Sequence, residues 1–308
     1  MRLFLAIFLC ATFIASAQTS TVLVDVFTNS HCSPCAGMHN AVSASITSTF
    51  RANNVIVVHN HWRTYVDDPI YQANMTQPVE RASWLGGVSG TPTVFFNGAR
   101  KSGSYNDWPS VLDELIATAS AYTIVPVLSY TADSLILTYT ATRNSPAGMP
   151  TVYGVLVENV TYTGRNGVSE HDGAMRALLT PVAGNPLEFN VDNVATGRIA
   201  IARQELWDLS KVRAVVSIQD PTTKKSLQAA QVEAQMATDV HDETFEASGP
   251  ATADVVDVRG SIVSHHEGLL LDNVGIVSQV TRTLPSGAYF VRIVRGTSIT
   301  VQPIAITR

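Results

Sequence analysis

Two cysteines, Cys32 and Cys35, lie in the segment HCSPC, between a run typical of a buried strand and a run typical of a helix. The preceding residues, TVLVDVFT at 21–28, are mostly β-branched and aromatic. In the following residues, AGMHNAVSASITSTF, apolar side chains recur at every fourth position from Met38 to Phe50 and form one helix face. The pattern therefore predicts a strand, the cysteine pair and a helix, in that order.

Residues 1–17 are typical of an export signal. They contain one arginine, an apolar run and the small residues ASA before Gln18, where we expect cleavage. Cleavage removes Cys10, so the mature chain keeps only Cys32 and Cys35. Because a pair separated by two residues closes almost no loop, it adds little stability, and chemistry is the better reason for its presence.

Charge and hydropathy argue against a nucleic-acid partner and against a membrane-spanning helix in the mature chain. The formal net charge is −5 and no basic block is present, so we expect no nucleic-acid partner. No segment after the signal is apolar over a membrane-spanning length, so we expect no transmembrane helix in the mature chain.

The chain up to residue 122 continues with alternating strand and helix patterns. NVIVVHNH predicts a second strand, and the next helix pattern is interrupted or bent at Pro78. The strand TVFF then meets Asn97-Gly98, a strong hairpin signal, and Asp107 begins a last helix. The predicted order is β-α-β-α-β-β-α, which makes a complete small α/β domain over 18–122.

This order, the C-x-x-C pair at a strand-to-helix turn and Thr91-Pro92 before a later strand resemble the thioredoxin-like family. The resemblance implies a cis Thr91-Pro92 peptide beside the dithiol, where partner peptides dock. A helix start favours an anion, which suits Cys32 as the attacking thiolate and Cys35 as the resolving cysteine. His31 could add positive charge beside Cys32. No cofactor is expected apart from a redox-active Cys32–Cys35 disulfide.

The first strand departs from the thioredoxin pattern. Thioredoxins place a buried acid there, and the matching position in this chain is Val26. Asp25 is one residue away and therefore lies on the opposite face of a strand. Proton handling for the second cysteine is not explained by the sequence.

A metal site is the alternative use of the same cysteines. Cys32, Cys35 and His39 give three possible ligands, and His59 or His61 at the next strand end could reach the same edge. Isolated histidines near a strand end are usually solvated or hydrogen-bonded, so we expect no metal. A permanently oxidised, idle pair is a further alternative.

Residues 123–236 change to short strands separated by Gly, Pro and Asn, which predicts an immunoglobulin-like β-sandwich. Two exceptions are SLQAAQVEAQM, which has a helical period, and HDGAMRALL from His171, which we expect to be a turn and a short surface helix. Together with HNHWRTYVDDPIY and GTPTVFFNG, these segments resemble a family of bacterial outer-membrane or surface proteins in which a thioredoxin-like domain precedes an immunoglobulin-like one. A polar linker, 237–249, follows.

The last segment, 250–308, contains LPSGAYFVRI and ends in a basic residue. These features resemble the C-terminal sorting domain of type IX secretion cargo, which implies a small β-sandwich. Its partners would be the Sec and type IX secretion machinery. An ordinary terminal β-domain is the alternative, because Tyr289, Val291 and Ile293 alternate as in any strand.

These features predict a multidomain chain with an α/β thioredoxin-like domain, an immunoglobulin-like β-sandwich and a small C-terminal β-sandwich. The function that they favour is thiol-disulfide exchange on protein substrates at the surface of a Gram-negative bacterium or outside the cell. The alternative is a non-catalytic adhesion or assembly protein that uses the thioredoxin-like fold as a scaffold.

Overall fold

A computed structural model describes residues 19–144, 148–237, 251–257, 261–269, 273–295 and 298–306. Contacts divide the chain into two compact units, Met1–Ala237 and Thr238–Arg308. The predicted signal peptide with Cys10, and the predicted linker beyond residue 237, lie outside the described residues. Among the described helices, none is long and apolar enough to cross a membrane.

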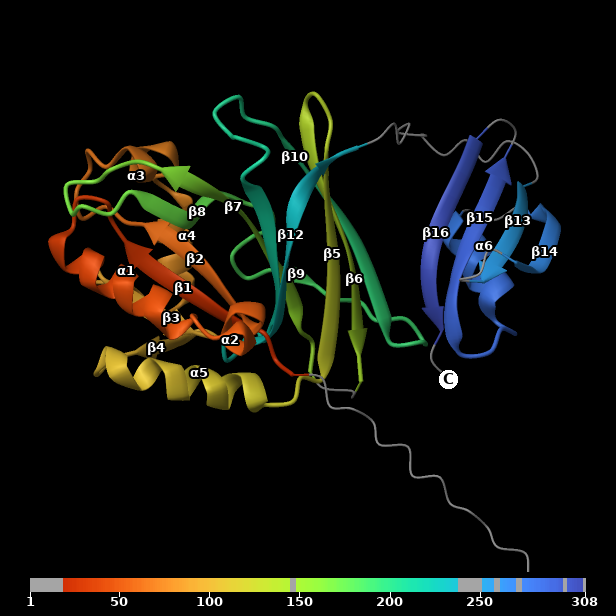
Figure 1. Cartoon of the computed structure of the whole chain (residues 1–308), viewed down its shortest axis with the longest axis horizontal. Coiled ribbons are helices and arrows are strands. Elements are labelled where there is room, and N and C mark those ends of the chain that lie inside the picture. Colours follow the sequence, from red (N-terminus) through yellow and green to blue (C-terminus); the bar gives the residue numbers. More distant parts are fainter. Residues whose placement is uncertain are drawn as a thin grey trace, which may run out of the picture. The chain divides into compact units, whose positions relative to one another are not determined.

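The first unit alternates helices and strands before it becomes all β (Figure 1). Its helices are α1 (Ser33–Ser45), α2 (Thr49–Asn54), α3 (Pro69–Ala73), α4 (Gln77–Trp84) and α5 (Trp108–Ala117), with a 3-10 turn η1 (Tyr105–Asp107) before α5. Its first strands are β1 (Val22–Thr28), β2 (Val55–His61), β3 (Thr93–Phe96) and β4 (Ala99–Lys101). The later strands are β5 (Tyr122–Tyr130), β6 (Ser134–Arg143), β7 (Thr151–Thr161), β8 (Glu170–Leu178), β9 (Asn185–Pro186), β10 (Val194–Ala202), β11 (Val212–Gln219) and β12 (Ser226–Met236).

Strands β1 to β4 form the sheet expected of a thioredoxin-like fold. The order is β2-β1-β3-β4, with β1 parallel to β2 and antiparallel to β3. Asn97 and Gly98 both have positive φ and join β3 to β4 by the predicted two-residue turn. The predicted second helix is divided into α3 and α4, and Pro78 lies in the first turn of α4, where its missing N–H costs nothing.

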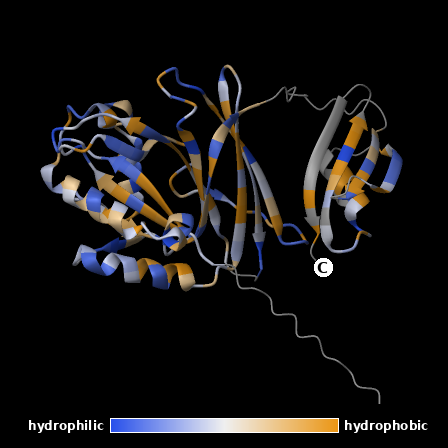
Figure 2. Cartoon of the chain, viewed as in Figure 1, coloured by the Kyte–Doolittle hydropathy of each residue, from blue (hydrophilic) through white to orange (hydrophobic). Residues whose placement is uncertain are grey.

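The two faces of this sheet are covered by different elements. Alternate residues of β1 point to opposite faces, and Val22, Val24 and Val26 pack with apolar residues of α1 and α5. On the other face, Leu23 packs in a cluster with residues of β2, β7, β8, β11 and β12, and Phe27 packs in a cluster with residues of α4. Figure 2 shows the apolar residues along the interior strands.

Strands β5 to β12 continue the same hydrogen-bonded path rather than forming a separate pair of sheets. Within the described residues, twelve strands are joined, and β8 pairs with β2 in parallel at His59 and Ala174. One cluster buries residues of β5 and β6 against residues of β7 and β11, so the path folds back on itself around a core, as in a sandwich. The domain boundaries at 122 and 236 stay predictions.

Two helix predictions are wrong. SLQAAQVEAQM forms strand β12, paired with β11, and HDGAMRALL lies in strand β8, paired with β7. Polar side chains in these segments are accommodated by specific partners. Arg176 Nε lies 2.6 Å from Glu158 Oε2, and His171 Nε2 lies 3.0 Å from the Tyr162 carbonyl oxygen.

The second unit contains β13 (Ala251–Asp257), β14 (Ile262–Leu269), α6 (Asn273–Thr281), β15 (Gly287–Arg295) and β16 (Ser298–Ile306). Its described residues form one sheet, β14-β13-β15-β16, and one helix instead of the two sheets of the predicted sandwich. The helix forms because Ile276 and Val280, four residues apart, bury one face in the core. Tyr289, Val291 and Ile293 of β15 point into that core, so their predicted alternation is confirmed.

A buried ion pair lies on the same face of β1 as Leu23. Asp25 is fully buried and Arg81 is 1% exposed, and the guanidinium contacts the carboxylate through Nε–Oδ1 at 3.1 Å and Nη2–Oδ2 at 2.8 Å. Arg81 also donates to Gln219 of β11 and lies over the ring of Tyr153 of β7, 4.0 Å from its centroid. Asp25 therefore faces away from the helices that cover Val26, as its position in the strand predicts.

We expect Arg81→Met to lower the free energy of unfolding by about 3–5 kcal/mol, because it leaves the Asp25 carboxylate buried without its partner. Asp25→Leu/Arg81→Met should recover most of the loss, since it removes both charges. Urea unfolding measures each value.

Arg51→Met is the matched control, because Arg51 pairs with the half-exposed Asp113, and it should cost about 1 kcal/mol or less. A loss of that same small size in Arg81→Met would contradict the structural role of the buried pair.

Candidate functional site

The cysteine pair lies at the start of α1, as the sequence predicts. Cys32 is the residue before the helix, Ser33 and Pro34 begin it, and Cys35 N–H donates to the Cys32 carbonyl at 3.1 Å. The two sulfurs form a disulfide. Cys32 is 2% exposed and Cys35 is 1% exposed, whereas Ser33 and Pro34 are exposed. The pair thus lies just below the surface at a helix N-terminus.

The Thr91–Pro92 segment lies beside this pair. Its peptide bond is cis, and the Thr91 carbonyl oxygen lies 3.8 Å from Cys32 Sγ. Thr93 begins β3 directly after it, and its hydroxyl donates to the Gly90 carbonyl. The structure therefore brings together all four residues that the sequence singles out for exchange and docking: Cys32, Cys35, Thr91 and Pro92.

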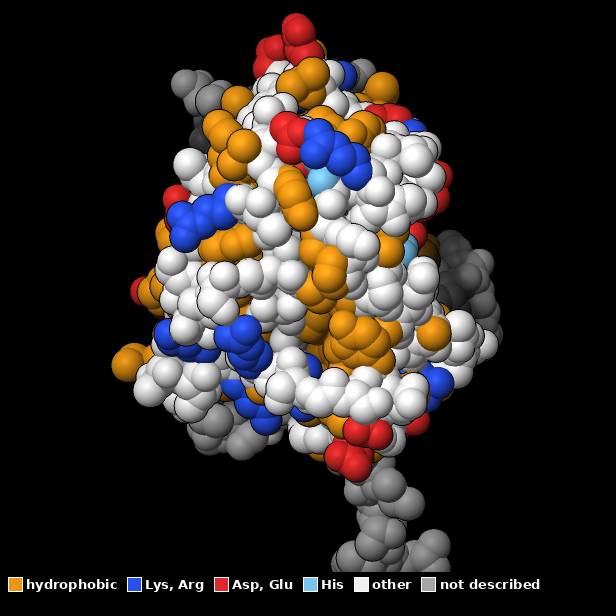
Figure 3. All heavy atoms as spheres, turned by 90° about the vertical axis from the view of Figure 1, so that its left-hand side faces the viewer, with side chains coloured by type: hydrophobic (Ala, Val, Ile, Leu, Met, Phe, Trp, Pro, Cys, Tyr) orange, Lys and Arg blue, Asp and Glu red, His pale blue; other side chains and the backbone are white. Residues whose placement is uncertain are grey.

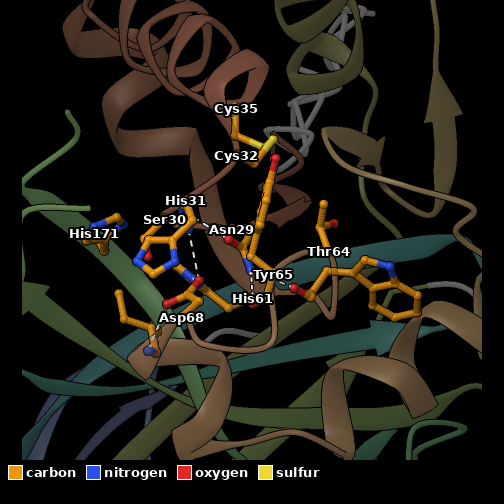
Figure 4. A network of polar contacts seen from close by, with 12 residues as sticks. Asn29, Ser30, His31, Cys32, Cys35, His61, Thr64, Tyr65, Asp68 and His171 are labelled. Atoms are coloured by element: carbon orange, nitrogen blue, oxygen red, sulfur yellow. Dashed lines mark hydrogen bonds and ion pairs between the residues drawn. A yellow bond between two sulfur atoms is a disulfide. The ribbon is translucent and has the colours of Figure 1, made fainter. Parts of the chain in front are cut away.

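A segment after β2, residues 62–68, crosses beside the cysteine loop; we call it the strap (Figure 4). Asn29 Nδ2 donates to the carbonyls of Trp62 and Tyr65, at 2.8 and 3.0 Å. Thr64 and Thr91 share a hydroxyl–hydroxyl hydrogen bond of 2.7 Å. The strap is thus tethered on one side to the loop that precedes Cys32 and on the other to the Thr91–Pro92 segment.

Asp68 anchors the end of the strap. Its carboxylate accepts from the Ser30 N–H at 2.9 Å and from the Ile70 N–H at 2.9 Å, and it lies 2.8 Å from His61 Nδ1. Burial opposes ionisation of this carboxyl, but the contacts with His61 and Ser30 outweigh burial and hold its pKa well below the usual range. The charged form of Asp68 therefore joins the strap, the cysteine loop and α3.

His31 faces the strap rather than the sulfurs (Figure 4). Its Nδ1 lies 3.2 Å from Asp67 Oδ1 and its Nε2 lies 3.2 Å from the Tyr162 hydroxyl. Arg165 pairs with the other oxygen of Asp67. The hydrogen bond from His31, with help from Arg165, lowers the pKa of Asp67 below its ordinary value. Both ring nitrogens of His31 are thus engaged, and its predicted modulating role stays a proposal.

The loop between β7 and β8, residues 162–169, forms a further wall of the site (Figure 1). Asn166 Nδ2 donates to the carbonyls of Asn29 and Cys32, both at 3.3 Å, and its backbone N–H donates to Ser30 O at 3.1 Å. Gly164 passes so close that a Cβ there would lie 2.1 Å from Ser30 O. A segment of the all-β section therefore contacts the cysteine loop directly.

Four histidines lie together next to this site. His59 and His61, two residues apart on β2, point to the same side, and the rings of His39 and His171 lie 5.8 Å from His59 and 5.3 Å from His61, respectively. Burial lowers the pKa of His59 to about 3 and that of His171 to about 4, so both are neutral at pH 7. Among the described residues, no three His, Cys, Asp or Glu side chains are arranged to hold a metal ion.

The sequence analysis did not identify the strap or the 162–169 loop as parts of the site. The strap has a signal that could have identified it, because β1 and β2 are parallel and residues after their carboxyl ends meet at one sheet edge. Two aspartates and two aromatic residues follow β2 there. The 162–169 loop has no comparable signal, since its pairing with the cysteine loop spans more than 130 residues.

Figure 3 shows the face on the left-hand side of Figure 1, where a band of hydrophobic side chains runs down the middle with basic and acidic side chains beside it. Two exposed apolar residues, Tyr65 and Val66, belong to the strap. The cysteine pair thus lies near a surface that offers apolar side chains to a partner.

No protein-family model matches the chain, and a search of curated proteins finds no match. Among solved structures, HBP35 of Porphyromonas gingivalis is similar over 94% of this chain and 99% of that chain, with a TM-score of 0.64 and 15% sequence identity. A domain of the outer membrane lipoprotein Omp28 from the same organism covers 38% of this chain and 90% of that chain at 15% identity, with a TM-score of 0.30, too low to support a shared fold. The first similarity shows that the fold is shared.

Burial of His59 makes stability depend on pH. The unfolded chain takes up a proton near pH 6.5, whereas folded His59 does so only near pH 3, so this stability is complete above pH 6.5 and is lost as the pH falls toward 3. We expect His59 to lower the free energy of unfolding by about 2 kcal/mol between neutral pH and about pH 5. His171, whose pKa is also lowered by burial, adds to this loss. Urea unfolding at neutral and acid pH measures it.

In His59→Gln, the free energy of unfolding should fall less between neutral pH and pH 5, because most of the contribution from His59 is gone. His265→Gln changes an exposed histidine of the second unit and should leave the contribution from His59 unchanged. The same pH dependence in His59→Gln and in the unmodified chain would show that burial of this imidazole is not the cause.

Proposed function

We propose that the protein is an exported thiol-disulfide oxidoreductase that acts on protein dithiols or disulfides at the cell surface or outside the cell. The observation that carries the proposal is the Cys32–Cys35 disulfide at the start of α1, with the Thr91 carbonyl 3.8 Å from Cys32 Sγ. A helix N-terminus stabilises a thiolate, and thiolate is the form that attacks a disulfide. The proposed site needs no cofactor other than this redox pair.

The proposed reaction is a balanced exchange between a dithiol in the protein and a disulfide in the substrate. In the reduced protein, the Cys32 thiolate attacks one sulfur of a substrate disulfide, forms a mixed disulfide and releases the other substrate sulfur as a thiolate, which takes a proton from water. Cys35, after losing its proton, then attacks Cys32 Sγ and releases the second substrate thiol. The protein is oxidised by two electrons and the substrate is reduced by two. The opposite direction uses the same steps in reverse.

Thr91 and Pro92 are the proposed docking residues for the substrate chain. A backbone carbonyl next to the reactive sulfur can accept a hydrogen bond from the N–H of an extended peptide, which brings a substrate disulfide into line with Cys32. The apolar side chains of the strap, Tyr65 and Val66, would then contact the same peptide. Protein segments around cysteines are therefore the substrate class that fits.

A scaffold function is the second candidate, and burial of the sulfurs favours it. Both cysteines are at most 2% exposed, and Val26 occupies the position where thioredoxins have an acid for proton transfer. A protein of this kind would bind partners at the cell surface through its fold and would not need Cys32 or Cys35 to react.

Export and surface display are part of the proposal and rest on the sequence. Residues 1–17 would direct the chain through Sec, and residues 250–308 would direct it through the type IX machinery of a Gram-negative bacterium. In the described part of that segment, GAYFVRI of this motif lies in β15, an interior strand whose neighbours are β13 and β16. Changes in this motif would therefore disturb the whole small sheet.

The exchange reaction predicts different behaviour for the two cysteines. In an insulin-reduction assay with dithiothreitol as the electron donor, the mature chain should accelerate precipitation and Cys32→Ser should be inactive. When Cys35→Ser is reduced, freed of dithiothreitol and then mixed with insulin, it should accumulate a mixed disulfide with the substrate, because no second cysteine in the chain resolves the first intermediate. Mass spectrometry under non-reducing conditions detects this species.

Thermal unfolding of each variant shows whether it is folded. If the folded Cys32→Ser/Cys35→Ser chain keeps full biological activity at the cell surface and the unmodified chain never reduces insulin, the scaffold function is the correct one.

The sorting proposal predicts that deletion of residues 250–308 leaves the protein in the periplasm. Fractionation and protease accessibility of whole cells measure the location, with thermal unfolding of the shortened chain as the control for folding. Unchanged surface display of the shortened chain would refute the sorting role.

A further inference from the structure

Tyr65 is a strap residue whose side chain points toward the cysteine pair. Figure 4 shows its side chain standing between the strap and the cysteines, with the hydroxyl pointing toward the disulfide. The side chain is 43% exposed, so packing alone does not explain this orientation. Its edge faces the His31 ring, with centroids 6.4 Å apart.

Thr64 and the carbonyl group of Tyr65 are each hydrogen-bonded to a residue that contacts Cys32. On one side, Thr64 is bonded to Thr91, whose carbonyl lies 3.8 Å from Cys32 Sγ. On the other side, the Tyr65 carbonyl accepts from Asn29, whose own carbonyl accepts the Cys32 N–H at 3.1 Å. These contacts fix the position of the Tyr65 backbone relative to Cys32, independently of its side chain.

The N-terminus of α1 favours a thiolate at Cys32, and a further hydrogen-bond donor to the sulfur would stabilise it more. The Thr91 carbonyl near the sulfur is an acceptor and disfavours an anion there. His31 uses both ring nitrogens on Asp67 and Tyr162, and Arg165 pairs with Asp67. At 2% exposure, water reaches Cys32 poorly. A phenolic O–H is a donor at neutral pH.

We propose that the Tyr65 hydroxyl donates a hydrogen bond to the Cys32 thiolate in the reduced protein and that Tyr65 is therefore a catalytic residue. The inference rests on the proposed function, in which Cys32 reacts as a thiolate. The Cys32 proton goes to water, and the Tyr65 proton stays on its oxygen and is only shared. Because the bond exists only in the reduced state, it stabilises that state and makes the disulfide more oxidising.

The test is the pKa of Cys32 in the reduced chain. Tyr65→Phe removes only the hydroxyl, and we expect it to raise the Cys32 pKa by about one unit, so that the thiolate fraction below the pKa falls about tenfold. The pH dependence of iodoacetamide alkylation, followed at Cys32 by peptide mass spectrometry, gives the value. The reduction potential should fall in parallel, by about 30 mV for a tenfold change.

Tyr105→Phe is the matched control, because Tyr105 is similarly exposed, at 41%, and its ring lies against Trp108. It should leave the Cys32 pKa unchanged. An unchanged pKa in Tyr65→Phe would overturn the inference.

This measurement separates the two proposals, because alkylation needs no protein substrate. A pKa that depends on Tyr65 in a chain that never reduces insulin would end the proposed function and keep the thiolate contact. If the chain reduces insulin but the Cys32 pKa does not depend on Tyr65, the proposed function stands and the Tyr65 contact is refuted.

Discussion

The packing of β7 and β11 against β1 and β2 is the interaction on which the rest of the structure depends. Helices α1 and α5 cover only one face of the β1–β4 sheet, and the apolar residues of the other face require a cover of their own. The all-β section supplies most of it with Tyr153, Val155 and Val215, and α4 packs beside them on Phe27. The same contact encloses Asp25, whose charge is tolerated there because Arg81 pairs with both carboxylate oxygens.

This packing also builds the site. Because β8 pairs with β2, the loop before β8 reaches the cysteine loop, and Asn166 binds the carbonyls of Asn29 and Cys32. The strap comes from the end of β2 and the Thr91 carbonyl from the segment before β3. Three stretches of chain therefore surround the cysteine loop. The strap and the 162–169 loop are hydrogen-bonded to that loop, and the Thr91–Pro92 segment is hydrogen-bonded to the strap. A site held in this way keeps both sulfurs shielded, while Ser33 and Pro34 at the helix start and Tyr65 and Val66 of the strap are exposed to a partner.

The sequence was informative where the signal is local. The strand before Cys32, the helix after Cys35 and the Asn97-Gly98 turn follow from spacing and backbone preference, and the structure has all three. His171 was misassigned because a polar residue normally indicates the surface, whereas here the Tyr162 carbonyl satisfies it inside a sheet. Tyr65 could not be found from its own type, since its importance comes from tethers to Asn29 and, through Thr64, to Thr91.

The central claim is that Cys32 and Cys35 form a working redox pair, and its reduction potential tests that claim most directly. Equilibration of the mature chain in glutathione buffers, with the thiols trapped by acid and alkylation, gives the value. The account predicts a single two-electron transition between roughly −270 and −120 mV, the range of thiol-disulfide oxidoreductases. A disulfide that stays oxidised below about −300 mV, as structural disulfides do, would contradict it.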